Sequence, residues 1–254
     1  MSSDETWKAV LTGQAPGIHR IRRVFGAIPS SPRCKLCSAP FGAPRNLLLR
    51  FTGYRRSPLN RRLCNVCLRE AQKEPGGAEV EITALFVDVR GSTHLAETIP
   101  PEEYSRLIAK LYGITARVVD AHDGVVDKFV GDGAVALFIP GFAGPDHAAQ
   151  GVAAARELAE VIADEGLELP VGIGVHSGIS FVGTIGEGDA FDFTALGDTV
   201  NATSRVTAAA RAGEILVTDA AAEAAGLATE SLERRTLELR GRTQAIGAVV
   251  LGAG

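Results

Sequence analysis

Two aspartates, each beside a glycine-containing turn, are the residues best suited to chemistry. Asp88 lies near the end of the apolar run EITALFVDV and precedes RGST, and Asp132 lies in FVGDG between two apolar runs. A carboxylate at the end of a buried strand is costly unless it is paired or binds a metal. Alone, each fits an ordinary turn. Together, two carboxylates beside a turn whose backbone amides suit a phosphate indicate a two-metal phosphoryl-transfer site.

A second polar group lies in the segment DFTALGDTVNATSR, residues 192–205. The pattern predicts a helix with Asp198 as N-cap and Gly213 just past its end. Asn201 and Arg205 are four residues apart and therefore share one helix face. That face is either solvated or directed at a ligand, and Thr194 lies just upstream.

Four cysteines form two pairs, CKLC at Cys34 and Cys37 and CNVC at Cys64 and Cys67. Each pair can present two thiolates from one tight turn, and two such turns complete a tetrahedral four-sulfur site. Zinc is the favoured metal, although the 26 residues between the pairs exceed the commonest zinc-ribbon spacing. A mononuclear iron or an iron–sulfur cluster, and four unligated thiols, are the alternatives.

Composition is that of a globular protein, with 46% hydrophobic and 22% charged residues in 254. No apolar run approaches the ~18 residues that span a bilayer, and the start MSSDETWKAV lacks the sections of a signal peptide. We therefore expect a cytoplasmic protein without a membrane span. Its thiols should stay reduced, so disulfides are not expected.

Charge divides the chain into two parts. Residues 1–79 hold 14 Lys and Arg against 5 Asp and Glu, whereas the remainder holds 12 against 25. The basic part could bind nucleic acid or could dock on the acidic part. Nucleic acid is the weaker interpretation, because only three aromatic residues nearby could stack on bases: Phe41, Phe51 and Tyr54.

We expect four segments: an irregular basic stretch at 1–33, a zinc-ribbon-like metal module at 34–70, a linker at 71–79 and a larger domain at 80–254. In the last, the apolar run ending near Asp88 predicts a buried strand, and Pro100 and Pro101 predict a helix start. GVVDKFV and AVALFIP predict a hairpin, and residues 145–165 a helix. LPVGIGVHSGISFVGTIG is typical of a long strand pair or hairpin, and EILVTD, LERRTLELR and AIGAVVL complete the strands. The predicted fold class is α+β, with helices packed on a mainly antiparallel sheet.

Four motifs, FVDVRGST, KFVGDG, VGIGVHSG and ALGDTVNATSR, occur in this order, and residues 79–252 resemble the catalytic domain of class III adenylyl and guanylyl cyclases. The resemblance implies a ferredoxin-like cyclase fold and a head-to-tail homodimer with shared active sites. Asp88 and Asp132, assisted by the Val89 carbonyl, would bind two Mg²⁺ or Mn²⁺ ions. The partner chain would supply Lys128 and Thr194 for the base, Asn201 for the ribose and Arg205 for the reacting phosphorus. The other expected nucleotide contacts are Arg90, Gly91, Ser92, Thr93, Gly131, and Arg240 or Arg242.

ATP is the expected substrate, and cyclic AMP and pyrophosphate the products. A lysine ammonium can donate to adenine N1, which is an acceptor, whereas guanine N1 carries a hydrogen. The Thr194 oxygen can accept from the adenine N6 amine, and threonine here resembles a subgroup that includes bicarbonate-responsive adenylyl cyclases. The alternatives are a cyclase-like module that binds nucleotide with little turnover and a basic zinc lobe that binds nucleic acid. A histidine in GVHSG, His176, is expected to be structural.

Overall fold

A computed structural model describes residues 3–28, 30, 32–42, 51–58, 63–186, 192–238 and 245–252. The chain forms two compact units. The first comprises Met1–Val80, Pro140–Gly144 and Phe181–Ala195, and the second comprises Glu81–Ile139, Pro145–Ser180 and Leu196–Gly254. Two long strands, β1 (Gly77–Val89) and β4 (Val171–Ile185), contribute residues to both units.

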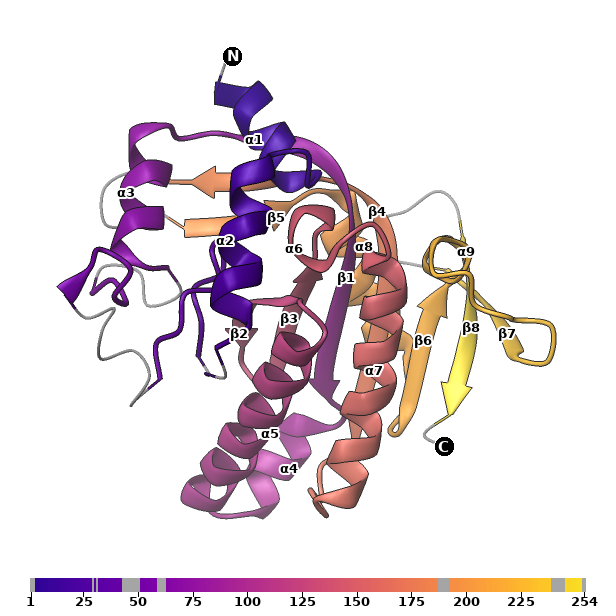
Figure 1. The fold of residues 1–254 in the computed structure, drawn as a ribbon. Helices are drawn as coiled ribbons and strands as arrows, with labels where there is room; N and C mark the ends of the chain where they lie inside the picture. Colours follow the sequence, from indigo (N-terminus) through magenta and orange to yellow (C-terminus); the bar gives the residue numbers. More distant parts are fainter. Residues whose placement is uncertain are drawn as a thin grey trace. The chain divides into compact units, whose positions relative to one another are not determined.

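The remaining strands are β2 (Val125–Val130), β3 (Gly133–Phe138), β5 (Asp192–Leu196), β6 (Glu214–Thr218), β7 (Glu233–Leu237) and β8 (Ile246–Gly252). The eight strands form one sheet in the order β2-β3-β1-β4-β6-β8-β7, with β5 paired to β4 (Figure 1). The pairs β1/β3, β2/β3, β6/β8 and β7/β8 are antiparallel, and β4/β6 is parallel. This agrees with the expected α+β class.

Apolar runs account for the central strands of the second unit. In β6 the consecutive residues Ile215, Leu216 and Val217 are all buried. Because successive side chains point to opposite faces of a sheet, both faces of this strand are covered. Helices α7 (His147–Asp164) and α8 (Asp198–Ala209) both contact β6. Such strands are read from sequence as continuous apolar runs.

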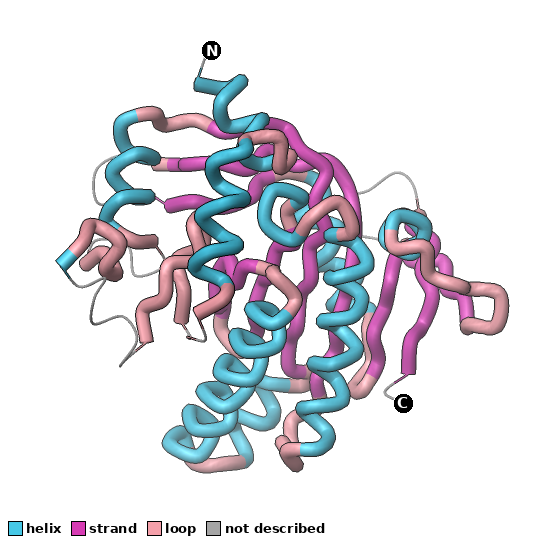
Figure 2. Tube along the Cα trace, viewed as in Figure 1, coloured by secondary structure: helices cyan, strands magenta, loops and turns pink. Residues whose placement is uncertain are grey.

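Helices α5 (Pro101–Ala121) and α7 run side by side over the sheet (Figure 2). Helix α5 begins as expected, with Pro101 in its first turn, where the missing amide proton costs nothing. Its inward residues Leu111, Ile114 and Val118 follow helical spacing. Two short helices, α4 (Ser92–Thr98) and α9 (Asp219–Ala224), complete this unit.

The first unit contains helices where the sequence predicted irregular structure. Residues 1–33 include α1 (Ser3–Leu11) and α2 (Pro16–Gly26), so that expectation was wrong. Pro16 begins a helix instead of preventing one, because proline fits the first helical turn. Trp7 and Leu11 anchor α1 in the core, while α3 (Asn65–Lys73) and α6 (Pro140–Ala143) complete the unit.

Three further boundaries differ from the sequence predictions. The linker at 71–79 is instead the end of α3, a short connection and the start of β1. The segment expected as a strand pair is the single strand β4. Asp198 is the first residue of α8, with Gly197 as N-cap, and the helix ends at Ala209, before Gly213. The division into sequence modules at residue 79 stays a prediction.

Within the described part of the chain, no helix combines the length and the apolar character needed to cross a bilayer.

Candidate active site and cysteine cluster

Asp88 and Asp132 lie on neighbouring segments of the second unit. Asp88 is the penultimate residue of β1, and Asp132 lies in the turn between β2 and β3. Val87 pairs with Ala134 in the antiparallel register, which brings the turn alongside the end of β1. A Cβ on Gly133 would lie 2.7 Å from the Val87 carbonyl oxygen and 3.1 Å from Asp88 Oδ1. The glycine therefore permits the close approach of the turn to the carboxylate.

The Asp132 carboxylate fits a cation. Its Oδ2 is buried and has no hydrogen-bond partner among the described residues. An unpaired buried carboxylate oxygen is costly, and Mg²⁺ and Mn²⁺ prefer oxygen ligands. The Tyr112 hydroxyl donates to the Gly131 carbonyl, and its ring stacks on Phe129 with centroids 4.0 Å apart, which fixes the turn. Burial, together with the charge of Asp132, raises the pKa of Tyr112.

Arg90 occupies the space beside both carboxylates. Its guanidinium forms an ion pair with Asp88 and donates to the Ala208 carbonyl at 3.2 Å. Burial lowers the pKa of Arg90, an effect that the negative charge of Asp132 opposes. The backbone amide of Arg90 donates to the Pro170 carbonyl at 2.6 Å. Arg90 is thus a neighbour of the two aspartates.

The turn after Val89 has the shape expected of a tight strand-to-helix connection. Gly91 has φ of 65°, in the left-handed region, and a Cβ there would meet nothing within 4 Å. Ser92 and Thr93 begin α4. Their amides belong to a first helical turn, where backbone N–H groups have no intrahelical acceptor.

Lys128 follows a buried acidic residue that the sequence analysis missed. Asp127 is 1% exposed, and its Oδ2 lies 3.3 Å from Lys128 Nζ. The register of β2 against β3 shifts between Val126 and Lys128, as at a β-bulge. Val125 and Asp127 are both buried, so Asp127 lies on the inward side of β2, where residue type alone predicts an apolar side chain.

Asn201 and Arg205 project from the same face of α8, as their spacing predicted. The inward face carries Ala202, Thr203 and Val206, all buried, whereas Asn201 is exposed and Arg205 is half-buried. For these two side chains the structure describes no hydrogen bond or ion pair within the ranges given above.

Thr194 lies in β5 and belongs to the first unit. It is 7% exposed, and its neighbours Phe193 and Ala195 are each 1% exposed. Arg240 and Arg242 lie outside the described residues. His176 is partly buried, with Nδ1 2.8 Å from Thr218 Oγ1, in keeping with a structural role.

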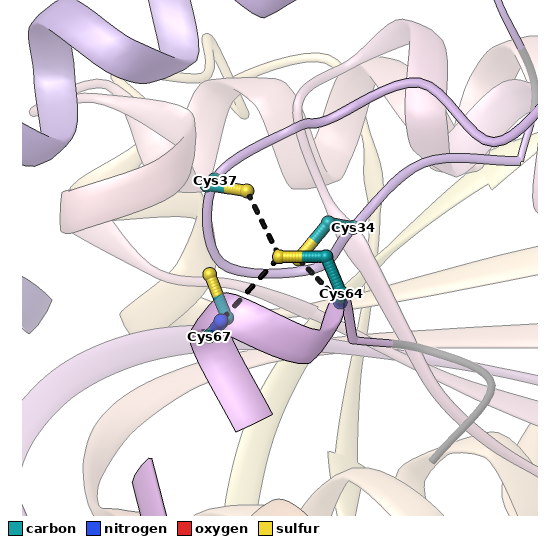
Figure 3. Close-up of side chains that lie close together, drawn as sticks. All are labelled: Cys34, Cys37, Cys64 and Cys67. Atoms are coloured by element: carbon teal, nitrogen blue, oxygen red, sulfur yellow. Dashed lines mark hydrogen bonds between the residues drawn. The ribbon is translucent and has the colours of Figure 1, made fainter. Parts of the chain in front are cut away.

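The four cysteines converge as their pairing predicted (Figure 3). Their sulfurs all lie within 4.8 Å of one another, and those of Cys37 and Cys64 are 3.7 Å apart. Zinc–sulfur bonds of about 2.3 Å in a tetrahedron place the sulfurs about 3.8 Å apart. The Cys64 amide donates to Cys34 Sγ at 3.3 Å, and the Cys67 amide to Cys64 Sγ at 3.4 Å. Such donors stabilise thiolates.

The thiols of the cluster share protons. Hydrogen bonds, above all with Cys34, raise the pKa of Cys37 and of Cys67. Burial opposes ionisation of Cys34, but its hydrogen bonds with the other three thiols lower its pKa well below the usual range. Four thiolates so close together repel one another, so full ionisation requires a cation. The cluster can therefore hold a metal such as zinc.

Several basic side chains of the first unit stabilise that unit's own fold. Arg33 donates to the carbonyls of Phe25 at 2.9 Å and Ile28 at 2.6 Å. Arg22 donates to the carbonyls of Lys35 and Leu36, and Arg56 lies over the Phe41 ring. These contacts explain part of the positive charge without a nucleic acid.

The sheet and the helices packed on it have the architecture of a nucleotidyl cyclase catalytic domain. Residues 77–252 match the family described as the adenylate and guanylate cyclase catalytic domain, and the chain belongs to this family. Members use two divalent metals and function as dimers.

The relatives include both purine specificities. The solved guanylyl cyclase Cya2 is 30% identical, with a TM-score of 0.65 over 70% of this chain and 95% of that chain. The adenylyl cyclase CyaB from P. aeruginosa is 23% identical, with a TM-score of 0.61 over 70% of this chain and 97% of that chain. Rv1318c of Mycobacterium tuberculosis, an uncharacterised protein, is 34% identical over 67% of this chain. The match spans only 32% of Rv1318c, about a third of its length.

Proposed function

We propose that this protein is an adenylate cyclase that converts ATP to 3′,5′-cyclic AMP and pyrophosphate. The observation that carries the proposal is the proximity of Asp88 and Asp132 at the end of β1, with a buried Asp132 oxygen that has no partner among the described residues. These carboxylates suit two Mg²⁺ or Mn²⁺ ions, with the Val89 carbonyl as a further ligand. Such ions lower the pKa of a hydroxyl and offset phosphate charge.

The chain's own residues account for the remaining steps. Amides of the turn at Gly91, Ser92 and Thr93 hold the triphosphate. Asn201 orients the ribose so that its 3′-hydroxyl faces the α-phosphorus. The hydroxyl loses its proton to solvent water, its oxygen bonds to the α-phosphorus, and the bond from that phosphorus to the leaving pyrophosphate breaks. Arg205 stabilises the charge that develops there, a role in which one arginine can contribute ~10³-fold.

Lys128 and Thr194 support ATP as the substrate. The Lys128 ammonium donates to adenine N1, and the Thr194 hydroxyl accepts from the N6 amine. The Lys128 side chain is 41% exposed, which leaves its ammonium accessible beside Asp127. Because similar structures include both adenylyl and guanylyl cyclases, the choice of purine rests on these two side chains.

A homodimer completes the proposal, with the base, ribose and arginine contacts supplied to the partner's metal site. Ile179 in β4 and Leu196 in β5 are 67% and 50% exposed, and these two strands are paired. Exposed apolar side chains gathered on adjoining strands are typical of an interface. One similar solved structure is described as a dimeric guanylyl cyclase domain.

Zinc is the proposed metal of the cysteine cluster, because the sulfur spacing fits its tetrahedral geometry. Purified protein should contain one zinc per chain by elemental analysis. Cys37→Ser should lose most of this zinc. All 4 cysteines of the chain belong to the cluster, so the control must be a residue of another type. Ser38→Ala, adjacent to the cluster, provides the matched variant.

A turnover assay tests the enzymatic proposal. Full-length protein is incubated with ATP or GTP and with Mg²⁺ or Mn²⁺, and cyclic products are resolved by chromatography. We expect cyclic AMP from ATP and little cyclic GMP from GTP. The Asp132→Asn variant should lose the activity, because its amide cannot supply the same charge to a cation. Predominant cyclic GMP would reject the purine assignment, and no product under any condition would favour a nucleotide-binding module.

A further inference from the structure

Arg22 connects the first cysteine pair to α6. Its Nη1 donates to the carbonyls of Lys35 at 2.9 Å and Leu36 at 3.0 Å, the two residues between Cys34 and Cys37. Its guanidinium carbon lies 4.7 Å from the centroid of the Phe142 ring. A guanidinium over an aromatic face is attracted to it, so the cysteine turn and Phe142 share one anchor.

The second cysteine pair reaches Trp7 through α3. Cys64 is the N-cap of α3 and accepts a hydrogen bond from the Cys67 amide. At the other end of that helix, the Glu74 carbonyl accepts from Trp7 Nε1 at 3.0 Å. Two thiols fix one end of α3, and the Glu74 carbonyl at its other end binds the indole of Trp7. The position of α3 therefore determines the position of the indole.

Both connections meet at Phe193. Its ring stacks on Trp7 at a centroid distance of 5.9 Å and an interplanar angle of 23°, and lies 6.1 Å from Phe142. Phe193 is 1% exposed and directly precedes Thr194 in β5. Closely packed rings transmit displacement because cores resist compression. The two cysteine pairs thus act on one aromatic residue beside the candidate base-contacting threonine.

We propose that the metal-bound cysteine cluster positions Thr194 through this aromatic contact, so that metal occupancy of the cluster controls use of the adenine nucleotide. Trp7, Arg22, Phe142 and Phe193 are positioning residues in this arrangement. The consequence for catalysis rests on the role of Thr194 in the proposed function, whereas the mechanical link from cysteines to Phe193 does not.

Trp7 is itself the probe, because it is the only tryptophan in the chain. Its fluorescence is recorded on full-length protein loaded with zinc, after removal of zinc by a chelator, and after zinc is restored. We expect emission to move to longer wavelength on removal, as the indole leaves its stack and meets water, and to return on reloading. Circular dichroism, measured in parallel, distinguishes this shift from unfolding.

Variants on α2 provide the matched comparison. Arg22→Gln should give zinc-loaded protein the emission of stripped protein, with zinc content unchanged. Arg20→Gln removes the same charge from an exposed position of the same helix and should resemble the wild type. The mechanical link would be overturned if the two variants had the same emission wavelength. It would also be overturned if wild-type emission stayed unchanged while the zinc content fell.

Kinetics test the catalytic consequence separately. Trp7→Ala should raise KM for ATP about tenfold and narrow the preference for ATP over GTP, with a smaller effect on kcat, because Phe193 beside Thr194 loses the ring that stacks on it. Trp7→Phe, which keeps a stacked ring, should restore most of the preference. An active wild type whose purine preference is unchanged in Trp7→Ala contradicts the proposal. A wild type that makes no cyclic nucleotide instead contradicts the proposed function and leaves the fluorescence result standing.

Discussion

A single absent side chain allows the two candidate metal-binding carboxylates, Asp88 and Asp132, to approach each other. Gly133 follows Asp132 directly and faces the end of β1, where any Cβ would press on the Val87 carbonyl and on Asp88. Both obstacles are costly to move, because one is sheet backbone and the other is a proposed metal ligand. Glycine is required here for space, unlike at Gly91, where φ is 65° and the surroundings are open.

Gly133→Ala should therefore impair metal binding more than it impairs folding. We expect the affinity for Mn²⁺ to fall at least tenfold, which corresponds to about 1.4 kcal/mol of binding free energy. Free Mn²⁺ is measured by its electron paramagnetic resonance signal. Gly113→Ala is the control, because a Cβ there has its nearest neighbour at 4.0 Å, within α5. That variant should gain about 0.5–1 kcal/mol of stability and bind Mn²⁺ as the wild type does. Equal affinities in both variants would refute the role of Gly133.

Asp127 should orient Lys128 toward the base. Asp127→Asn keeps the shape but removes the charge that attracts Lys128 Nζ at 3.3 Å. An ion pair with a partly exposed lysine contributes about 0.2–1 kcal/mol, so kcat/KM for ATP should fall about two- to fivefold. The loss should lie mainly in KM, because the base contact precedes chemistry. Steady-state kinetics check this, with Asp123→Asn, in the exposed turn before β2, as the charge-matched control.

The far edge of the sheet contains an ion pair that crosses a strand. Glu214 in β6 and Arg235 in β7 form two hydrogen bonds of 2.8 Å, although β8 lies between those strands. Both side chains are largely covered, at 16% and 17% exposure. The hydrogen bonds from Arg235 lower the pKa of Glu214 from 4.5 to about 2.

This ion pair should make the free energy of unfolding depend on pH. Because the folded pKa is lower than the unfolded one, the stabilisation is complete above pH 4.5 and is lost as the pH falls toward 2. Urea unfolding at a series of pH values should show wild type more stable than Glu214→Gln at pH 6 and the difference shrinking below pH 4.5. Glu233 also pairs with Arg235, but its side chain is 62% exposed. The control variant Glu233→Gln should therefore show little such difference. A constant difference across the range would contradict the assignment.

The elements near the metal site could be predicted because their signals are local. The apolar run before Asp88 and the hairpin around Asp132 each carry turn residues at fixed spacing, and both were confirmed. Strand β4 was predicted as a pair because its glycines resemble breaks. Gly174 instead lies against Thr207 of α8, where a larger side chain has no room. That contact, like the stacking of Trp7 on Phe193, joins distant residues and leaves no local pattern.

At the scale of the whole molecule, the candidate residues fall into two groups. Asp88, Asp132, Lys128, Asn201 and Arg205 belong to one compact unit, whereas Thr194 belongs to the unit that contains the cysteine cluster. In the proposed dimer, one chain provides the metal site and its partner provides Thr194, Lys128, Asn201 and Arg205. A symmetric pair then contains two complete sites, since an isologous interface repeats every contact twice.

Mixing inactive variants tests this division of the site between chains. Asp88→Ala and Arg205→Ala should each be inactive alone, because every site in either homodimer lacks one group. After random subunit exchange, half of the dimers pair the two variants, and each retains one site built from the intact metal half and the intact arginine. The mixture should therefore recover about a quarter of wild-type cyclic AMP formation. A mixture of Asp88→Ala with Asp132→Ala is the control, because both changes damage the metal half and no pairing restores a complete site. No recovery in the first mixture, once exchange is shown by mass-labelled subunits, would place all catalytic groups within one chain. Recovery in the control would instead place Asp88 and Asp132 of one site on different chains.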